Sequence, residues 1–128
     1  MDALTPLEAA VLEKVLSGES PVLGALRAQA RAAQVRQRDL TGVGFMTSLE
    51  VPSTLARAPL CAGEACFGDV AAKIPGLKHG AGFLFFVRDG RLDAVEGYTY
   101  GEAWPQEVAT FSLEYMNEGR RDFGSLGI

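Results

Sequence analysis

The sequence predicts an α+β fold in which two N-terminal helices pack on one face of a mainly antiparallel sheet of about four or five strands. Three observations support this prediction. Two proline-led segments before residue 38 space their apolar residues four apart, as amphipathic helices do. From Thr41 onward the apolar residues alternate with polar ones, as in strands with one buried face. Asp89-Gly90, between two apolar segments, is typical of a two-residue hairpin turn.

The first helix is expected to begin at Thr5-Pro6-Leu7-Glu8, which has the capping threonine, the proline and the carboxylate of a capping box. Apolar residues at four-residue spacing form the face to be buried: Leu7, Val11 and Val15. Ser17-Gly18 ends this pattern. Ser20-Pro21 then begins a second helix, which we expect over about Val22 to Gln37.

The second helix carries a polar stripe made of Arg27, Arg31, Gln34 and Arg38. Guanidinium groups one turn apart can follow the phosphates of a nucleic acid. No aromatic residue is interleaved for base stacking, however, and the formal net charge is −4. A solvated helix face explains the stripe better, so we expect no nucleic-acid partner.

Further segments after Thr41 are predicted as strands. Thr41 to Val51 alternates apolar and polar residues until Pro52. Ala65 to Ile74 fits either a short strand broken at Gly68 or a single helical turn, and both remain open. Val108 to Tyr115 alternates again and is expected to be the last strand.

The hairpin is predicted over residues 83 to 98. With a two-residue turn, the register pairs Val87 with Leu92, Phe85 with Ala94 and Phe83 with Glu96. Glu96 would then share a face with apolar residues, where a carboxylate is costly unless it is hydrogen-bonded. We expect Glu96 either to accept bonds from the backbone of Gly101 to Trp104 or to face a pocket, and we favour the first.

Length and composition indicate one domain, residues 1–128, because a chain of 128 residues has the common domain size. With 48% apolar and 22% charged residues the chain is globular rather than disordered. No apolar run approaches the roughly 20 residues of a membrane helix. The first residues lack the basic region and long apolar stretch of a secretory signal. We expect a cytoplasmic protein with no membrane partner.

Cys61, Cys66 and the single histidine, His79, are the possible soft metal ligands. Structural zinc sites usually need four ligands, so one position would stay unfilled unless a carboxylate joined. We therefore expect free, metal-free thiols. The glycine-rich segments lack the Gly-Lys-Ser/Thr of a phosphate loop and the glycine pattern of dinucleotide sites. No cofactor is expected.

Tyr98, Tyr100 and Trp104 lie in the densest group of aromatic and acidic residues. Their amphipathic rings are common at protein interfaces, where they bury much area and keep a polar group available. They are equally common in hydrophobic cores. We weigh the two roles about evenly.

The same region also contains residue types that occur in two kinds of catalytic site. Glu96 and Glu102, with Asp93, are the residue types of a glycosidase carboxylate pair. His79-Gly80-Ala81-Gly82 is similar to the oxyanion loop of some esterases, but no serine or cysteine nucleophile motif accompanies it. We assign no catalytic residue.

Four segments follow one another in the chain: Leu-Arg-Ala-Gln at 26 to 29, Arg-Asp-Leu-Thr-Gly-Val-Gly-Phe-Met-Thr at 38 to 47, His-Gly-Ala-Gly-Phe at 79 to 83, and Glu-Gly-Tyr-Thr-Tyr-Gly-Glu-Ala-Trp-Pro at 96 to 105. The chain resembles a family of small uncharacterised bacterial proteins that share these blocks, over most of residues 26 to 115. Ala103 departs from the pattern, which has a second proline there. The resemblance implies no activity, although some such domains are suspected immunity proteins beside toxins.

We expect a non-enzymatic protein-binding module, of which an immunity or antitoxin-like inhibitor is one form. The candidate binding residues are Glu96, Tyr98, Tyr100, Glu102, Trp104 and His79. Two alternatives stay open. One is a small-molecule pocket or weak hydrolase that uses Glu96, Glu102 and His79, and the other is a self-associating homodimeric domain. The expected partner is thus another protein, such as a toxin, or a second copy of the chain.

Overall fold

The computed structural model describes residues 2–60 and 63–128. Cys61 lies outside this range, so the prediction for its thiol is untested, whereas Cys66 is free and exposed. Two helices, α1 (Pro6–Val15) and α2 (Pro21–Ala32), precede the sheet. Its strands are β1 (Gln34–Leu40), β2 (Gly44–Glu50), β3 (Glu64–Phe67), β4 (Val70–Lys73), β5 (Ala81–Arg88), β6 (Arg91–Thr99) and β7 (Ser112–Tyr115). Short 3-10 turns at Asn117–Gly119 and Gly124–Leu126 follow.

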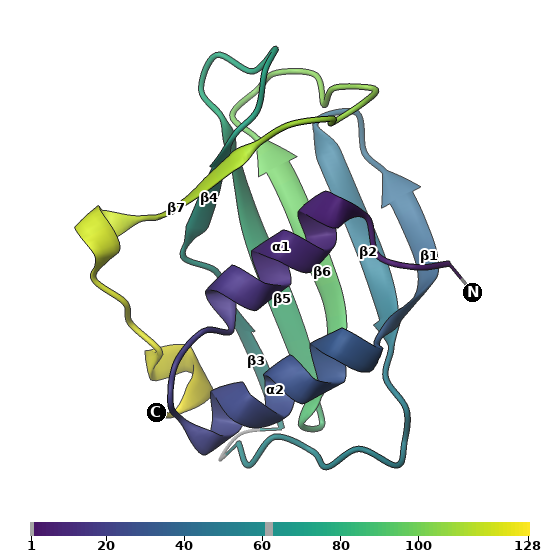
Figure 1. The fold of residues 1–128 in the computed structure, drawn as a ribbon, viewed down its shortest axis with the longest axis vertical. Helices are drawn as coiled ribbons and strands as arrows, with labels where there is room; N and C mark the ends of the chain where they lie inside the picture. The colour runs from purple at the N-terminus through teal and green to yellow at the C-terminus, as the bar shows by residue number, and fades with distance from the viewer. Residues whose placement is uncertain (1, 61–62) are drawn as a thin grey trace.

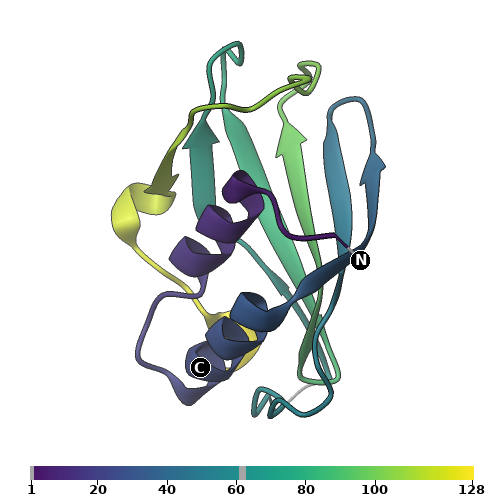
Figure 2. The same ribbon diagram turned by 45° about the vertical axis from the view of Figure 1, so that its right-hand side comes forward.

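All strand pairs of the sheet are antiparallel, and the order is β1-β2-β6-β5-β4-β7. β3 pairs with the Phe85–Arg88 end of β5, next to β4 on the same edge. Both helices lie on one face of this sheet (Figures 1 and 2). The predicted α+β class and the placement of the helices are confirmed.

The helices begin where the sequence predicts. Thr5 accepts a hydrogen bond from the backbone N–H of Glu8 at 3.1 Å, and the Glu8 carboxylate accepts one from the N–H of Thr5 at 2.8 Å. This is the predicted capping box, with Pro6 at the first helical turn. Ser20 caps α2 through the N–H of Val22. The core then forms where both helices meet the sheet.

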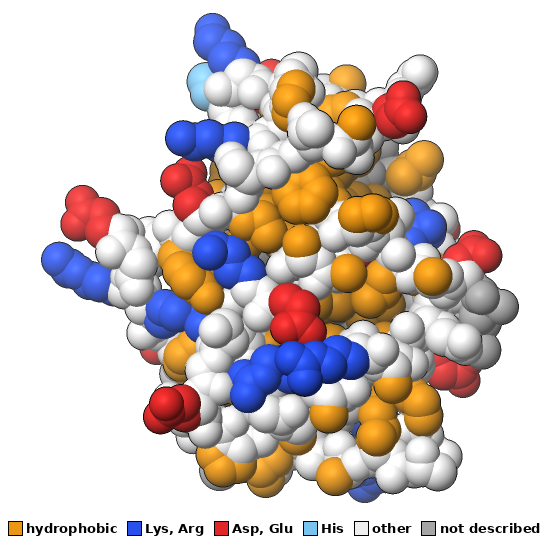
Figure 3. Space-filling view, viewed as in Figure 1, with side chains coloured by type: hydrophobic (Ala, Val, Ile, Leu, Met, Phe, Trp, Pro, Cys, Tyr) orange, Lys and Arg blue, Asp and Glu red, His pale blue; other side chains and the backbone are white. Residues whose placement is uncertain are grey.

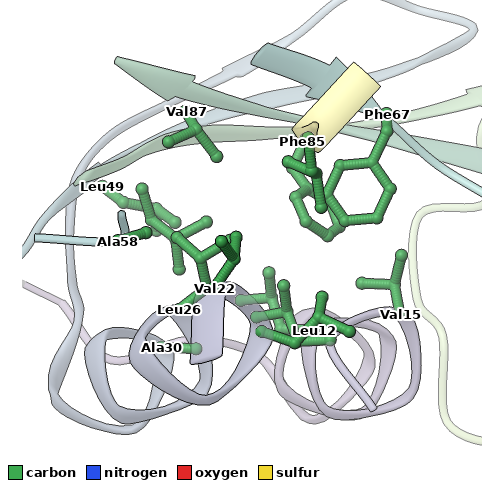
Figure 4. Packing of buried hydrophobic residues seen from close by; sticks show 14 of the residues in the cluster. Leu12, Val15, Val22, Leu26, Ala30, Leu49, Ala58, Phe67, Phe85 and Val87 are labelled. Atoms are coloured by element: carbon green, nitrogen blue, oxygen red, sulfur yellow. The ribbon is translucent and has the colours of Figure 1, made fainter. Parts of the chain in front are cut away.

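Figure 4 shows this core from close by. α1 contributes Leu12 and Val15, and α2 contributes Val22, Leu26 and Ala30. The sheet supplies the opposing apolar side chains: Leu49, Phe67, Phe85 and Val87. The C-terminal segment also docks, because Arg121 bonds to Asp69 at 2.7 Å and to the carbonyl of Val15 at 2.6 Å.

The predicted second helix is wrong beyond Ala32. Ala33 already has extended backbone angles, and Gln34–Leu40 forms β1 instead of the last helical turns. The spacing of the arginines favours a helix, but this local preference is weak. Pairing of Gln34–Leu40 with β2 along the whole segment outweighs it. Val35 gains burial by this arrangement, since it is 3% exposed opposite Leu49.

The structure decides between the two alternatives for Ala65 to Ile74. The segment is extended and is broken at Gly68-Asp69 into β3 and β4, so the strand alternative is confirmed and the helical turn is wrong. A Cβ at Gly68 would lie 1.9 Å from the carbonyl oxygen of Phe83, so the chain crosses β5 too closely for any side chain. The last strand is β7, which is shorter than the predicted Val108 to Tyr115.

The hairpin turn is confirmed, and its register is partly wrong. Asp89 and Gly90 have φ values of 53° and 72°, as a type I′ turn requires. Val87 pairs with Leu92 as predicted, but a bulge next to this pair shifts everything beyond it. Phe85 therefore pairs with Val95, and Phe83 with Gly97. Glu96 instead pairs with Leu84, so it points to the opposite face of the sheet from Phe83.

Candidate functional site

The structure separates the predicted binding residues into three places. Glu96 and Tyr98 lie on the sheet face that the helices leave free, with Tyr100 just beyond the end of β6. Glu102 and His79 meet in the loops at one end of the sheet. Trp104 lies on the helix-covered side, packed edge-on against Phe45.

We call the first of these places the uncovered face. Its central side chains come from alternate positions of β2, β5 and β6: Met46, Leu84, Phe86, Ala94, Glu96 and Tyr98. Cys66 of β3 lies beside Phe86 on the same face. In the part of the chain that the structure describes, no helix packs on this face (Figure 2). Apolar and aromatic groups flank the Glu96 carboxylate, and Asp39 of the edge strand β1 lies on the same face opposite Met46.

Glycine in β5 lets the aromatic part of this face form. Tyr98 pairs with Gly82 on one side and with Gly44 on the other. A Cβ at Gly82 would lie 2.5 Å from the ring and hydroxyl of Tyr98, so the ring lies directly over this residue. Tyr100 packs against Tyr98 with ring centroids 5.7 Å apart and an interplanar angle of 81°. The two rings form an aromatic corner beside Glu96.

Glu96 has no hydrogen bond or ion pair to any residue within 2–60 and 63–128. Its side chain is partly buried, and its charge acts on its neighbours. Burial and the Glu96 carboxylate both raise the pKa of the Cys66 thiol. Burial, Tyr100 and Glu96 together raise the pKa of Tyr98. The predicted role of Glu96 in holding the Gly101 to Trp104 turn is therefore not found.

Other groups hold that turn. The N–H of Trp104 donates to the carbonyl of Gly42 at 2.9 Å, and the Thr99 hydroxyl donates to the carbonyl of Glu102. The Glu102 carboxylate accepts bonds from the N–H groups of Lys78 at 2.8 Å and His79 at 3.0 Å. These two bonds lower the pKa of Glu102. An ionised carboxylate of this kind fixes a loop and is poorly suited to act as an acid.

The hydrolase alternative required Glu96, Glu102 and His79 in one site. Glu102 contacts the backbone of His79, whose side chain is exposed. Glu96 lies between Met46 and Leu84 in the middle of the uncovered face. Glu102 and His79 are thus joined only through the backbone of His79, and Glu96 and Glu102 do not form a carboxylate pair.

A pocket of about 410 Å³ lies on the other side of the sheet, and we call it the α1 pocket. It is bounded by the first turn of α1, the end of β1 with the following turn, and the connection that holds Trp104. Its apolar walls include Leu7, Leu40, Phe45, Trp104 and Val108. Apolar side chains gather on this face around the N-terminal end of α1 (Figure 3).

The polar part of the α1 pocket includes an ion pair between the buried Glu8 and the partly exposed Arg38. Arg38 donates from Nη2 to Oε1 of Glu8 at 2.6 Å and from Nε to Oε2 at 3.1 Å. The Thr47 hydroxyl donates a third bond to this carboxylate. Burial raises the pKa of Glu8, but the bonds from Arg38, Thr47 and Thr5 outweigh it and hold the pKa below its usual value.

The sequence does not predict this pair, because local patterns indicate a separate role for each residue. The capping-box role of Glu8 is confirmed, whereas the solvated helix stripe predicted for Arg38 is wrong, since Arg38 lies in β1. One signal could have revealed it. Had Thr41 to Gly44 been recognised as a turn between two strands, Arg38 would have been placed opposite Thr47 on the face that the helices cover.

Comparison of the chain with models of protein families, with curated proteins and with solved structures found no match. Within residues 2–60 and 63–128, no group of three or more His, Cys, Asp or Glu side chains is arranged to hold a metal ion. In the same ranges no helix combines the length and apolar character needed to cross a membrane. The uncovered face and the α1 pocket are therefore the two candidate functional surfaces.

Proposed function

We propose that this protein is a non-enzymatic cytoplasmic module that binds a basic surface of another protein through the uncovered face. The observation that carries this proposal is the unpaired Glu96 carboxylate among apolar and aromatic side chains. No buried side-chain oxygen of the described residues lacks a hydrogen-bond partner, so the Glu96 carboxylate oxygens reach solvent and are free to pair with a guanidinium or ammonium group of a partner.

The aromatic corner supports a basic partner side chain. The face of a tyrosine ring attracts a Lys or Arg cation, and the Tyr98–Tyr100 pair stands next to Glu96 along the same strand. Leu84 and Phe86 extend the surface with apolar area, which contributes the hydrophobic part of an interface. Tyr and Arg are frequent anchors of such interfaces.

Electrostatics favour a different protein over a second copy of this chain. Each copy carries a formal net charge of −4 and the same unpaired carboxylate on this face. Two uncovered faces in contact would therefore bring like charges together. A basic partner has the complementary charge, and an immunity-type inhibitor of a basic toxin is one module of this kind.

The proposal is tested with three versions of the protein used as bait in extracts of its native cells: wild type, Glu96→Lys and Glu19→Lys. Glu19 is exposed between the two helices and gives the same change in charge away from the uncovered face. We expect a basic protein that wild type and Glu19→Lys retain and that Glu96→Lys loses. Equal capture by all three versions would refute the proposed surface, and a wild-type dimer that Glu96→Lys disrupts would favour the homodimer.

A further inference from the structure

The α1 pocket has the properties of a small-molecule site, and it lies on the opposite side of the sheet from the uncovered face. Its volume of about 410 Å³ falls in the range of roughly 300–1,000 Å³ that is common for ligand pockets. Such pockets are mostly apolar and orient their ligands with few polar groups. The α1 pocket fits this description, with Phe45 and Trp104 as aromatic walls.

Glu8 lines this pocket but has no free acceptor position for a ligand. Its Oε1 accepts bonds from the Thr5 N–H and from Arg38, and its Oε2 accepts bonds from Arg38 and the Thr47 hydroxyl. A carboxylate offers about four acceptor positions, so these four bonds use its capacity. The side chain is also 2% exposed. Glu8 therefore holds Arg38 in place and neutralises its charge.

Arg38 is the charged group that remains available, and the Gln106 amide and the Thr5 hydroxyl also line the pocket. A guanidinium has five N–H donors, and within the described residues Arg38 donates to Glu8 alone, from Nε and Nη2. Its Nη1 makes no bond to those residues. The side chain lines the pocket and is 27% exposed. The bidentate bond to Glu8 fixes the plane of the guanidinium, so its free donors are already oriented before a ligand arrives.

We propose that the α1 pocket binds a small molecule with an apolar body and an oxygen acceptor, either a carboxylate or a carbonyl, that accepts hydrogen bonds from Arg38. An ammonium group in that position would face N–H donors with no acceptor left on Glu8. The site should therefore reject cationic analogues of the same apolar body. This proposal does not depend on the protein-binding role of the uncovered face.

The single tryptophan provides a direct readout, because Trp104 lines the pocket and no other tryptophan contributes fluorescence. The intact protein is titrated with phenylpropionate, phenylpropionamide and phenylpropylamine, which share one apolar body. We expect a saturable change in Trp104 fluorescence with the acid or the amide. We also expect binding of the amine to be at least about tenfold weaker, since it loses a hydrogen bond to a charged donor.

Two variants localise the binding. Arg38→Lys keeps a cation opposite Glu8 but removes the planar fork, so the affinity for the acid or amide should fall about tenfold. Val108→Phe narrows the pocket without touching Glu8 and should also weaken binding, whereas the distant Glu19→Gln should bind as wild type does. Equal affinity for all three probes would overturn the proposal. So would unchanged binding by Val108→Phe, or no saturable response to acid and amide up to about 10 mM.

Discussion

Arg38 and Glu8 form a bidentate ion pair that ties the edge strand β1 to the first turn of α1, with N···O distances of 2.6 and 3.1 Å. The carboxylate that closes the α1 capping box is the same one that holds the arginine. One side chain thus serves both the start of a helix and its attachment to the sheet.

Glu8→Gln should destabilise the fold by about 2 to 4 kcal/mol, because the carboxylate that it removes is 2% exposed and is bonded to Arg38 and Thr47. The free energy of unfolding in denaturant measures this. Glu13→Gln is the matched control, since its partner Arg31 lies on the surface and the pair is well exposed. Glu13→Gln should lower the free energy of unfolding by less than about 1 kcal/mol. Equal effects of the two changes would contradict the structural role of Glu8.

The contribution of Glu8 should depend on pH. Its pKa in the folded protein lies below the ordinary value of 4.5, so the folded state favours the ionised form. The stability difference between wild type and Glu8→Gln should be full above the ordinary pKa and should shrink as the pH falls below it. Denaturant unfolding at a series of acidic pH values tests this. A stability difference that grows on acidification would show that the pKa of Glu8 is not lowered in the folded protein.

Gln29 should be needed for the loop that crosses the hairpin turn. It is 0% exposed, donates to the carbonyls of Ala56 and Gly90 at 3.0 Å, and accepts from the N–H of Leu92 at 2.9 Å. Gln29→Met keeps the approximate volume but removes the partner of the Ala56 carbonyl and of the buried Leu92 N–H, whereas the Gly90 carbonyl keeps its bond from the Ala58 N–H. We therefore expect a loss of about 2 to 4 kcal/mol in the free energy of unfolding.

Thermal unfolding of Gln29→Met beside Gln37→Met checks this prediction. Gln37 is exposed on β1, and its replacement should change stability by less than about 0.5 kcal/mol. A Gln29→Met variant as stable as wild type would mean that the buried amide does not hold the loop.

Glu96→Gln should make Cys66 more reactive. The negative charge of Glu96 raises the pKa of the Cys66 thiol, so its removal should lower that pKa and increase the thiolate fraction. The rate of alkylation at mildly alkaline pH, measured with Cys61 replaced by Ser, reports this change. An unaltered rate would argue that the two side chains are not neighbours on the uncovered face.

Local sequence signals were enough to predict several elements. The Thr5 to Glu8 capping box and the Asp89-Gly90 turn each depend on a few adjacent residues, and both lie where expected. The strand β1 could not be predicted in this way, because Gln34–Leu40 has no apolar alternation beyond Val35 and forms through pairing with β2.

The positions of the candidate site residues could not be predicted from the sequence for a similar reason. A single extra residue in β6, at the bulge beside Leu92, moves Glu96 from the core face to the uncovered face. The turn chemistry at Asp89-Gly90 does not reveal this bulge. Likewise, Glu8 and Arg38 meet through tertiary packing that no spacing along the chain encodes.

The most direct test of the proposed function is protection of Cys66 from alkylation inside native cells, in protein with Cys61 replaced by Ser. Cys66 is exposed in the free chain and lies on the uncovered face. We predict that it is alkylated slowly in cells, where a partner covers this face, and faster in the purified protein. Because loss of the Glu96 charge itself makes Cys66 more reactive, Glu96→Lys is compared with its own purified form, and we expect it to be alkylated equally fast in cells and in the purified state. Equal rates in cells and in purified wild-type protein would contradict the account.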